Sequence, residues 1–159
     1  MTVPNSIADA ATRSSCTCFT LRKLARTVSR LYDLHLATVK LKTTQYSLLK
    51  NIAQQALPVA QLASRVATDR TTLTRNLKPL LGAGWATLAD GTDARQRIVT
   101  ITAAGRHKLA AAHHAWRAAQ TELDQTLGPD LIDVLHENAA EVMAALTPLL
   151  SEKLHVEHH

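Results

Sequence analysis

Hydrogen-bond donors recur over one short stretch of this 159-residue chain, between Arg70 and Lys78. Their hydroxyl, guanidinium, amide and ammonium groups can donate to phosphate oxygens or to base edges in the major groove of DNA. Arg75 suits guanine and Asn76 suits adenine, whereas a threonine can reach a phosphate or a thymine methyl. The base-edge candidates are Thr71, Thr72, Arg75 and Asn76. Arg65, Arg70 and Lys78 are candidates for phosphate contacts or for plain solvated charge.

A helix is needed to present these donors together. Asp69 is a favourable N-cap, and Gly82 and Gly84 supply a stop, so a helix is predicted between them. Pro79 predicts a bend, or an end to the DNA-facing part, near Lys78. The apolar positions recur at helical spacing and would face a core: Leu73, Leu77 and Leu80 or Leu81.

A hairpin and a new helix follow. Two strand-like runs, residues 85–89 and 97–101, are joined by a polar segment that contains a turn-forming Asp90-Gly91. Thr102 can cap the next helix. A helix, a glycine-turned hairpin and a helix, in that order, are typical of a winged-helix DNA reader. The predicted fold is therefore mainly α with a small β wing.

The remaining sequence predicts further helices. An amphipathic helix covers about residues 17–37, Thr43 or Thr44 can cap a second, and Pro58 suits the first turn of a short third helix. Residues 67–69 make the connection of a helix-turn-helix. A last helix follows Gly128-Pro129. The predicted division is a flexible arm at 1–15, a helical dimerisation region at 16–42 and 103–151, and a winged helix-turn-helix DNA-binding domain at 43–102.

Charge is divided along the chain. Residues 1–108 hold sixteen Lys/Arg against five Asp/Glu, a net of +11, whereas residues 109–159 hold two against eight, a net of −6. The basic part is expected to face DNA. The acidic part carries two long helices whose apolar stripes would stay uncovered in a monomer, which indicates a homodimer. A helical interaction protein without DNA binding would explain these stripes but not the basic part.

Other classes of protein find little support. The sequence has no Gly-x-Gly-x-x-Gly, no Walker-type lysine and no recognisable triad for Cys18, so an enzyme is not expected. No cofactor and no metal site are predicted. Residues 1–15 lack the apolar run of a signal peptide, and no segment reaches the roughly 20 apolar residues of a bilayer span. A soluble, cytoplasmic protein with no membrane partner is expected.

Two motifs give the chain a family resemblance. Residues 69–75 of the donor-bearing helix and residues 93–97, followed by strand residues and by 102–105, resemble the MarR family of bacterial transcriptional regulators, and the likeness runs from about residue 16 to 150. The resemblance implies a homodimer that binds a pseudo-palindromic operator, usually as a repressor, with half-sites about 34–36 Å apart. It also implies that Arg95 enters a minor groove, that Asp93 orients it, and that Arg97 supports the wing or touches phosphate.

The regulatory signal has several candidates. Cys16-Thr17-Cys18-Phe19 resembles the organic-hydroperoxide-sensing branch of the family, in which a reactive cysteine precedes a phenylalanine. Tyr32 matches a tyrosine that in this branch hydrogen-bonds the partner's cysteine, whereas Arg22 stands where the branch has a second tyrosine. A helix N-terminus with Arg22 and Lys23 nearby would favour a thiolate and its oxidation to a sulfenic acid and a disulfide.

A small phenolic or aromatic ligand is the other main candidate for the signal. It would bind in a pocket lined by the first, second and fifth helices, with Tyr46, His35 and Trp116 as candidate lining residues, although such aromatic side chains also suit a simple core. Cys18 also suits a small buried hydrophobe. Joint binding of a soft metal by Cys16 and Cys18 would need an extended segment, because on a helix they lie about 200° apart.

Overall fold

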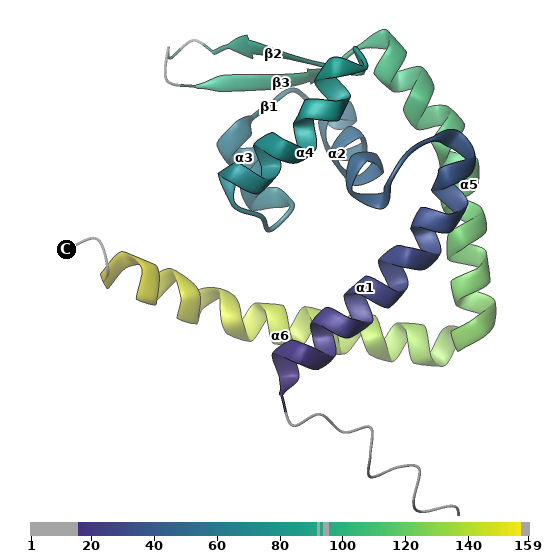
Figure 1. Ribbon diagram of the computed structural model, residues 1–159. Helices are drawn as coiled ribbons and strands as arrows, with labels where there is room; N and C mark the ends of the chain where they lie inside the picture. Colours follow the sequence, from purple (N-terminus) through teal and green to yellow (C-terminus); the bar gives the residue numbers. More distant parts are fainter. Residues whose placement is uncertain (1–15, 92, 94–95, 157–159) are drawn as a thin grey trace, which may run out of the picture. The chain divides into compact units, whose positions relative to one another are not determined.

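A computed structural model describes residues 16–91, 93 and 96–156 (Figure 1). Within these residues the chain is mainly helical with one small antiparallel sheet, which confirms the predicted fold class. The elements, in chain order, are α1 (Thr17–Leu36), a 3-10 turn η1 (Ala37–Val39), α2 (Thr43–Gln54), β1 (Leu57–Pro58), α3 (Val59–Arg65), α4 (Arg70–Gly82), β2 (Ala86–Asp90), β3 (Arg97–Ile101), α5 (Ala103–Leu127) and α6 (Pro129–Val156).

The chain divides into two compact units, one that ends at Arg117 and one that begins at Ala118. The boundary falls inside α5. The first unit therefore holds α1 and the start of α5 together with the helix-turn-helix and the sheet. The second unit holds the end of α5, a turn at Gly128 with φ of +78°, and α6.

The sheet has the strand order β1-β3-β2, and both pairings are antiparallel. β2 and β3 form the predicted hairpin, with Ala86 opposite Ile101 and Asp90 opposite Arg97. β2 begins one residue later than predicted. The two-residue strand β1 is not foreseen, because its Pro58 suggests a helix start. Pro58 instead ends an edge strand, where a missing N–H is tolerated, and α3 begins at the next residue.

A leucine-rich core joins the helices of the first unit to β3. Leu49 and Ile52 of α2, Leu62 of α3, Leu73 and Leu80 of α4, and Val99 of β3 are all fully buried. Each such side chain contributes roughly 1.5–3 kcal/mol by leaving water. Because the leucines of α4 occupy one face of the helix, as predicted, its polar residues lie on the others.

Both ends of α4 are capped, as their sequences predict. The backbone N–H of Thr72 donates to Asp69 Oδ1 at 2.8 Å. At the other end, Trp85 N–H donates to Leu80 O at 2.9 Å and Gly84 N–H donates to Leu81 O at 3.0 Å, with Gly84 at φ of +70°. This pair of bonds is a Schellman motif, which uses glycine for its left-handed residue.

Pro79 does not end the helix. In agreement with the predicted stop at Gly82 and Gly84, α4 continues through Pro79 to Gly82, whereas the bend or the end of the DNA-facing part near Lys78 stays a prediction. Pro79 removes one backbone hydrogen bond, but the last turn is held by the fully buried side chain of Leu80 and by the Schellman bonds that follow. The outer face of α4 therefore extends beyond Lys78.

The start of α2 is capped from another helix rather than by its own threonines. Thr43 is already the first residue of α2, and its N–H and hydroxyl both donate to Asp33 Oδ1 of α1, at 2.6 and 2.7 Å. The prediction that Thr43 or Thr44 is the N-cap is therefore wrong. The start of α5 agrees with its sequence, because Gly105 N–H donates to Thr102 Oγ1 at 3.0 Å.

Apolar side chains are exposed on the terminal helices of the isolated chain. In the first unit they are Phe19, Leu21, Leu24 and Leu34 of α1. In the second unit they are Leu131, Val134, Val142, Met143, Leu146, Leu149 and Leu150 of α6. Among the described helices, none combines the length and the apolar character needed to cross a bilayer.

Candidate DNA-binding interface

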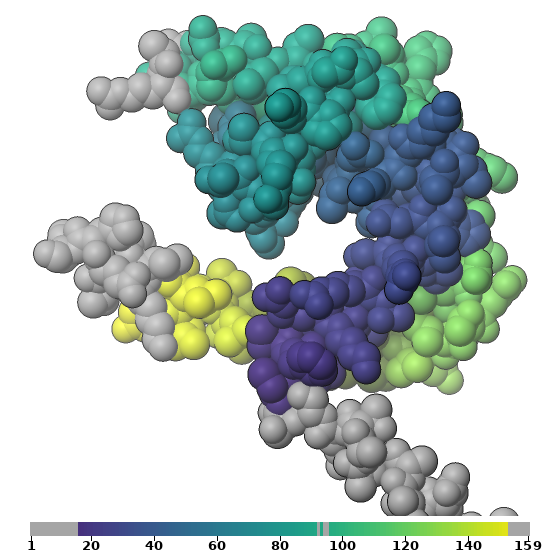
Figure 2. Space-filling view, in the orientation of Figure 1, coloured from purple at the N-terminus to yellow at the C-terminus, as the bar shows by residue number. Residues whose placement is uncertain are grey.

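The outer face of α4 carries a continuous stripe of donors. Thr71, Thr74, Arg75 and Lys78 follow one another at intervals of three, one and three residues, which places them on one side of a helix. All four are exposed, as is Arg70 at the first helical position. These five residues and Leu81 line one shallow hollow of the surface. In the space-filling view, α4 is exposed at the surface of the molecule (Figure 2).

The predicted base-edge candidates divide between two faces of α4. Thr71 and Arg75 lie on the outer stripe, whereas Thr72 and Asn76 are half-buried. The latter pair lines a second hollow between α4 and α2, together with hydroxyl-bearing residues of α2 such as Ser47. The structure therefore brings together four of the predicted donors on the outer stripe: Arg70, Thr71, Arg75 and Lys78.

Thr74 belongs to the outer stripe but is not among the predicted site residues. Thr74 is exposed, and its hydroxyl donates to the carbonyl of Arg70 at 2.8 Å, so its methyl group and its acceptor oxygen remain for contacts. Its spacing of three residues from Thr71 is the sequence signal by which it could have been found. Arg65, the last residue of α3, is exposed close in sequence to the start of α4.

The start of α4 combines an ionised N-cap residue with the first donors of the outer stripe. Hydrogen bonds from Thr72, through its side chain and its backbone N–H, lower the pKa of Asp69 below its usual value. Asp69 is exposed and ionised at neutral pH, so a negative charge faces the positive end of the helix dipole. Arg70 and Thr71, the next two residues, supply the first donors of the outer stripe.

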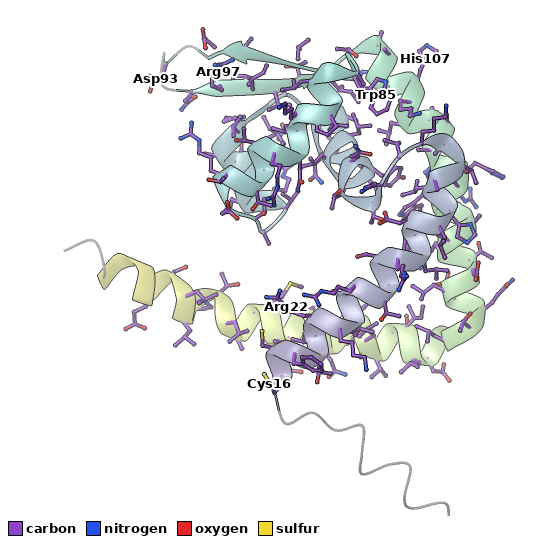
Figure 3. The ribbon with its side chains drawn as sticks, in the orientation of Figure 1. Cys16, Arg22, Trp85, Asp93, Arg97 and His107 are labelled. Atoms are coloured by element: carbon purple, nitrogen blue, oxygen red, sulfur yellow. The ribbon has the colours of Figure 1, made fainter. Side chains whose placement is uncertain are left out.

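The wing carries the second group of predicted residues. Arg97 Nε lies 3.2 Å from Asp90 Oδ1, across the register pair that closes the hairpin, and both side chains are exposed. Asp93 and Arg97 lie at the tip end of the hairpin and Trp85 at its base (Figure 3). Arg97 thus pairs with Asp90 across the hairpin, and its role in supporting the wing or touching phosphate stays a prediction. Arg95 lies outside the described residues, so its insertion into a minor groove, oriented by Asp93, stays a prediction.

A separate cavity of about 290 Å³ lies among α1, α2 and α5, the three helices expected to line an effector pocket. We call it the aromatic pocket. Its lining residues are Val28, Ser29, Tyr32, Thr43, Tyr46, Ser47, Lys50 and Trp116. Trp116 packs against both tyrosines, with ring centroids 5.9 Å from Tyr46 at an interplanar angle of 14° and 6.3 Å from Tyr32 at 42°. Such offset and tilted contacts are favourable for aromatic rings.

Polar groups border the rings of this pocket. Tyr46 Oη lies 3.3 Å from His113 Nδ1, and burial raises the pKa of Tyr46, so its hydroxyl stays protonated. Lys50 Nζ lies 4.8 Å from the centre of the Trp116 ring. Lys50 is not among the predicted residues, although its position one helical turn after Tyr46 is a signal by which it could have been found. His35 is half-buried on α1 but is not a lining residue.

The two cysteines lie at the start of α1, and both are exposed. Cys16 is the N-cap, with extended backbone angles of φ −91° and ψ 104° (Figure 3). Cys18 lies in the first turn of α1. In the isolated chain Cys18 is therefore not a buried hydrophobe. Among the described residues, no group of three or more His, Cys, Asp or Glu side chains is arranged to hold a metal ion.

The fold has close relatives among solved structures. The transcriptional regulator MosR of M. tuberculosis, in complex with DNA, is 33% identical to this chain, with a TM-score of 0.70 over 82% of this chain and 98% of MosR. The chain belongs to the MarR family. A mutant of MarR from E. coli complexed with operator DNA has a TM-score of 0.71 at 21% identity, over 78% of this chain and 91% of MarR.

Another MarR-type structure shares the fold. The transcriptional repressor CouR, bound to a 23-mer DNA duplex, has a TM-score of 0.72 at 23% identity, over 80% of this chain and 92% of CouR. Neither a protein-family model nor a curated protein matches the chain.

Proposed function

We propose that this MarR-family protein is a homodimeric transcriptional repressor that binds a pseudo-palindromic operator. A small phenolic or aromatic ligand in the aromatic pocket then releases it. The exposed stripe of Arg70, Thr71, Thr74, Arg75 and Lys78 carries the DNA-binding part of the proposal. Support also comes from MosR, which has the same fold, is 33% identical to this chain and was crystallised in complex with DNA.

The proposed homodimer is formed by α1 and the two last helices. Each of the terminal helices α1 and α6 exposes apolar side chains that a dimer would shield from water, among them Phe19 and Leu24 of α1 and Met143 and Leu146 of α6. A two-fold dimer would offer two copies of α4 to two half-sites of an inverted repeat. The intervening residues 43–102 act as the DNA-binding domain.

The aromatic pocket is placed where a ligand can affect α4. Thr43 lines the pocket and is bonded twice to Asp33, so α1 and α2 are joined at its wall. From the same helix α2, Ser47 lines both this pocket and the hollow that contains Asn76 of α4. A flat ring that wedges against Trp116 would displace α2 and, through it, the donor stripe. Release then follows if the ligand prefers the displaced state.

Blocking the aromatic pocket tests this proposal. Ser29→Phe adds a ring to the pocket lining, whereas His114→Phe adds one to an exposed position of α5 outside it. We expect both variants to bind an inverted repeat from the DNA upstream of the gene, at two chains per duplex in a gel shift. Phenolic acids and phenols should release wild-type protein and His114→Phe but not Ser29→Phe. Equal release of all three would contradict the pocket assignment.

Thiol oxidation is a second candidate for the signal, favoured by the exposure of both cysteines at the start of α1. A hydroperoxide would transfer its terminal oxygen to the Cys18 thiolate, giving a sulfenic acid and leaving as the alcohol after protonation. A second thiol, that of Cys16 or of the partner subunit, would then displace water and form a disulfide. Covalent linkage at this end of α1 would alter the helix that borders the aromatic pocket.

Cys18→Ser separates the two signals. We expect this variant to bind operator DNA like the wild type but to stay bound when cumene hydroperoxide is added, with release measured by gel shift and disulfide formation by non-reducing electrophoresis. Ser15→Ala, a conservative change nearby in the sequence, serves as the control and should remain sensitive. If the wild-type protein keeps its DNA at all peroxide concentrations that leave it folded, the thiol signal is ruled out.

A further inference from the structure

Lys108 of α5 contacts two segments that are far from it in the sequence. Its Nζ donates to the carbonyl oxygen of Val39, in the turn η1 between α1 and α2, at 2.5 Å. The same atom lies 4.7 Å from the centre of the Trp85 ring. Trp85 stands between the end of α4 and the start of β2, at the base of the hairpin (Figure 3). One side chain therefore joins the α1–α2 turn, the base of the wing and α5.

The surroundings of Lys108 favour these contacts over free solvation of its charge. Lys108, Val39 and Trp85 are all half-buried. Among residues 16–91, 93 and 96–156, Lys108 forms no ion pair with a carboxylate, so its charge is directed at a carbonyl group and an aromatic face. Both kinds of contact are stronger where water is partly excluded. The ammonium group is thus a fixed link between these segments.

The Trp85 end of this link is bonded to its surroundings on two sides. The Trp85 N–H donates to Leu80 O of α4 at 2.9 Å, and Trp85 O accepts the N–H of Thr102 at 3.1 Å. The hydroxyl of Thr102 also donates to Gly84 O at 2.6 Å. The last turn of α4, the start of the wing and the start of α5 are therefore bonded to one another. Lys108 connects all three to the turn that follows α1.

This connection matters because α1 belongs to the proposed dimer interface, whereas α4 carries the DNA-binding stripe. Two copies of α4 can occupy both halves of an inverted repeat only if their separation matches that of the half-sites. Each base pair added between the half-sites moves one of them by about 3.4 Å and turns it by about a tenth of a helical turn. A residue that fixes α4 relative to α1 therefore restricts the spacings that bind.

We propose that Lys108 is a positioning residue for DNA binding. Its ammonium group holds α4 and the wing at a fixed angle to α1, and the dimer is selective for one half-site spacing as a result. The inference rests on the proposed function, because it needs a homodimer on an inverted repeat. Lys108 acts through α4 and not by touching DNA, since its Nζ is engaged with Val39 and Trp85.

A double-mutant cycle tests the contact without DNA. Lys108→Met keeps an unbranched side chain and removes the ammonium group, and Trp85→Leu removes the ring. We expect the two changes in the unfolding constant, measured in urea, to depart from additivity by about 2- to 30-fold, the range of a cation–π contact. The control cycle pairs Lys108→Met with Trp116→Leu, further along α5, and should be additive. Additive changes for Lys108 and Trp85 would overturn the proposal.

Gel shifts with altered operators test the effect on DNA binding. The inverted repeat upstream of the gene is compared with versions that carry one or two extra base pairs between the half-sites. Wild-type protein should prefer the natural spacing. Lys108→Met should reduce this preference by about 2- to 30-fold, the range for a single side chain that couples two sites. Arg117→Met, which removes an exposed positive charge from α5, should keep the preference of the wild type.

The outcomes distinguish this inference from the function on which it rests. Wild-type protein that binds every spacing alike would contradict the proposed dimer on an inverted repeat and the role of Lys108 with it. A selective wild type together with an equally selective Lys108→Met overturns the role of Lys108 alone. Weaker binding of Lys108→Met by the same factor at every spacing would mean a merely structural role and also overturns it. The salt dependence should match that of the wild type, because no phosphate contact is removed.

Discussion

Gly105→Ala is expected to destabilise the first unit by about 3 kcal/mol, at the upper end of the usual cost of overpacking. A Cβ built at this position would lie 2.0 Å from Trp85 O and 2.8 Å from Ile101 Cγ1. The first neighbour is backbone, and the same carbonyl accepts the N–H of Thr102 at 3.1 Å. Neither α5 nor the base of the wing can give way without breaking this contact.

Urea unfolding followed by circular dichroism measures this cost. Gly82→Ala is the matched control, because nothing lies within 4 Å of a Cβ built there and its φ is not in the left-handed region. That control should be neutral or should stabilise α4 by up to about 1 kcal/mol, as alanine favours a helix over glycine. A Gly105→Ala protein with the urea midpoint of the wild type would show that α5 and the wing do not meet this closely.

Gly105 also illustrates what the sequence can and cannot predict. Its place after Thr102 marks the start of a helix, and that local signal is correct, as are Asp69, Gly84 and the leucine spacing of α4. Caps and helical faces depend on neighbours within a few residues, so a single sequence contains them. The contact of Gly105 with Trp85 joins segments that only the folded chain brings together.

The errors arise at contacts between distant segments. Asp33 caps α2 from α1, ten residues before Thr43, which no capping pattern within α2 contains. β1 exists because Leu57 and Pro58 pair with β3, about 40 residues later, and two residues have no periodicity of their own. Pro79 is no such error, because α4 runs through it to the predicted stop at Gly82, and burial of the adjacent Leu80 outweighs one missing hydrogen bond.

The candidate site shows the same division. Helical spacing is enough to group Arg70, Thr71, Arg75 and Lys78, and the same spacing includes Thr74, which the prediction omitted. Helical spacing does not decide which polar stripe faces α2. The half-burial of Thr72 and Asn76 beside α2 is therefore not predictable from spacing alone. The aromatic pocket depends on Trp116 lying beside two tyrosines from other helices. Composition and spacing suggest its members but not their contacts.

The outer stripe leads to the second prediction of large effect. Arg75→Ala should weaken operator binding by roughly 1–3 kcal/mol, or about 5- to 150-fold in Kd, without dissociating the proposed dimer. Arg75 is exposed in the middle of α4, with Thr71 one turn before it and Lys78 one turn after it. A guanidinium at this place can give two bonds to one guanine, and an alanine leaves that base edge without its partner.

The Arg75→Lys variant distinguishes a contact with a base from an effect of positive charge alone. Lysine keeps the positive charge but not the planar fork of the guanidinium, so a phosphate contact would survive the change and a bidentate base contact would not. We therefore expect Arg75→Lys to bind operator and unrelated DNA with more nearly equal affinity, as measured by competition gel shifts. Arg117→Ala, which removes an exposed arginine from α5, controls for net charge and should keep both affinity and specificity.

The salt dependence completes the assignment. Removal of one phosphate-binding side chain reduces the slope of log K against log salt by about one, whereas removal of a base-reading side chain lowers affinity at every salt concentration alike. Arg75→Ala should follow the second pattern and Lys78→Ala the first, since Lys78 offers a single ammonium near the end of the stripe. If Arg75→Ala binds its operator as tightly as the wild type, α4 does not read bases through its outer face, and the half-buried stripe of Thr72 and Asn76 becomes the one to test.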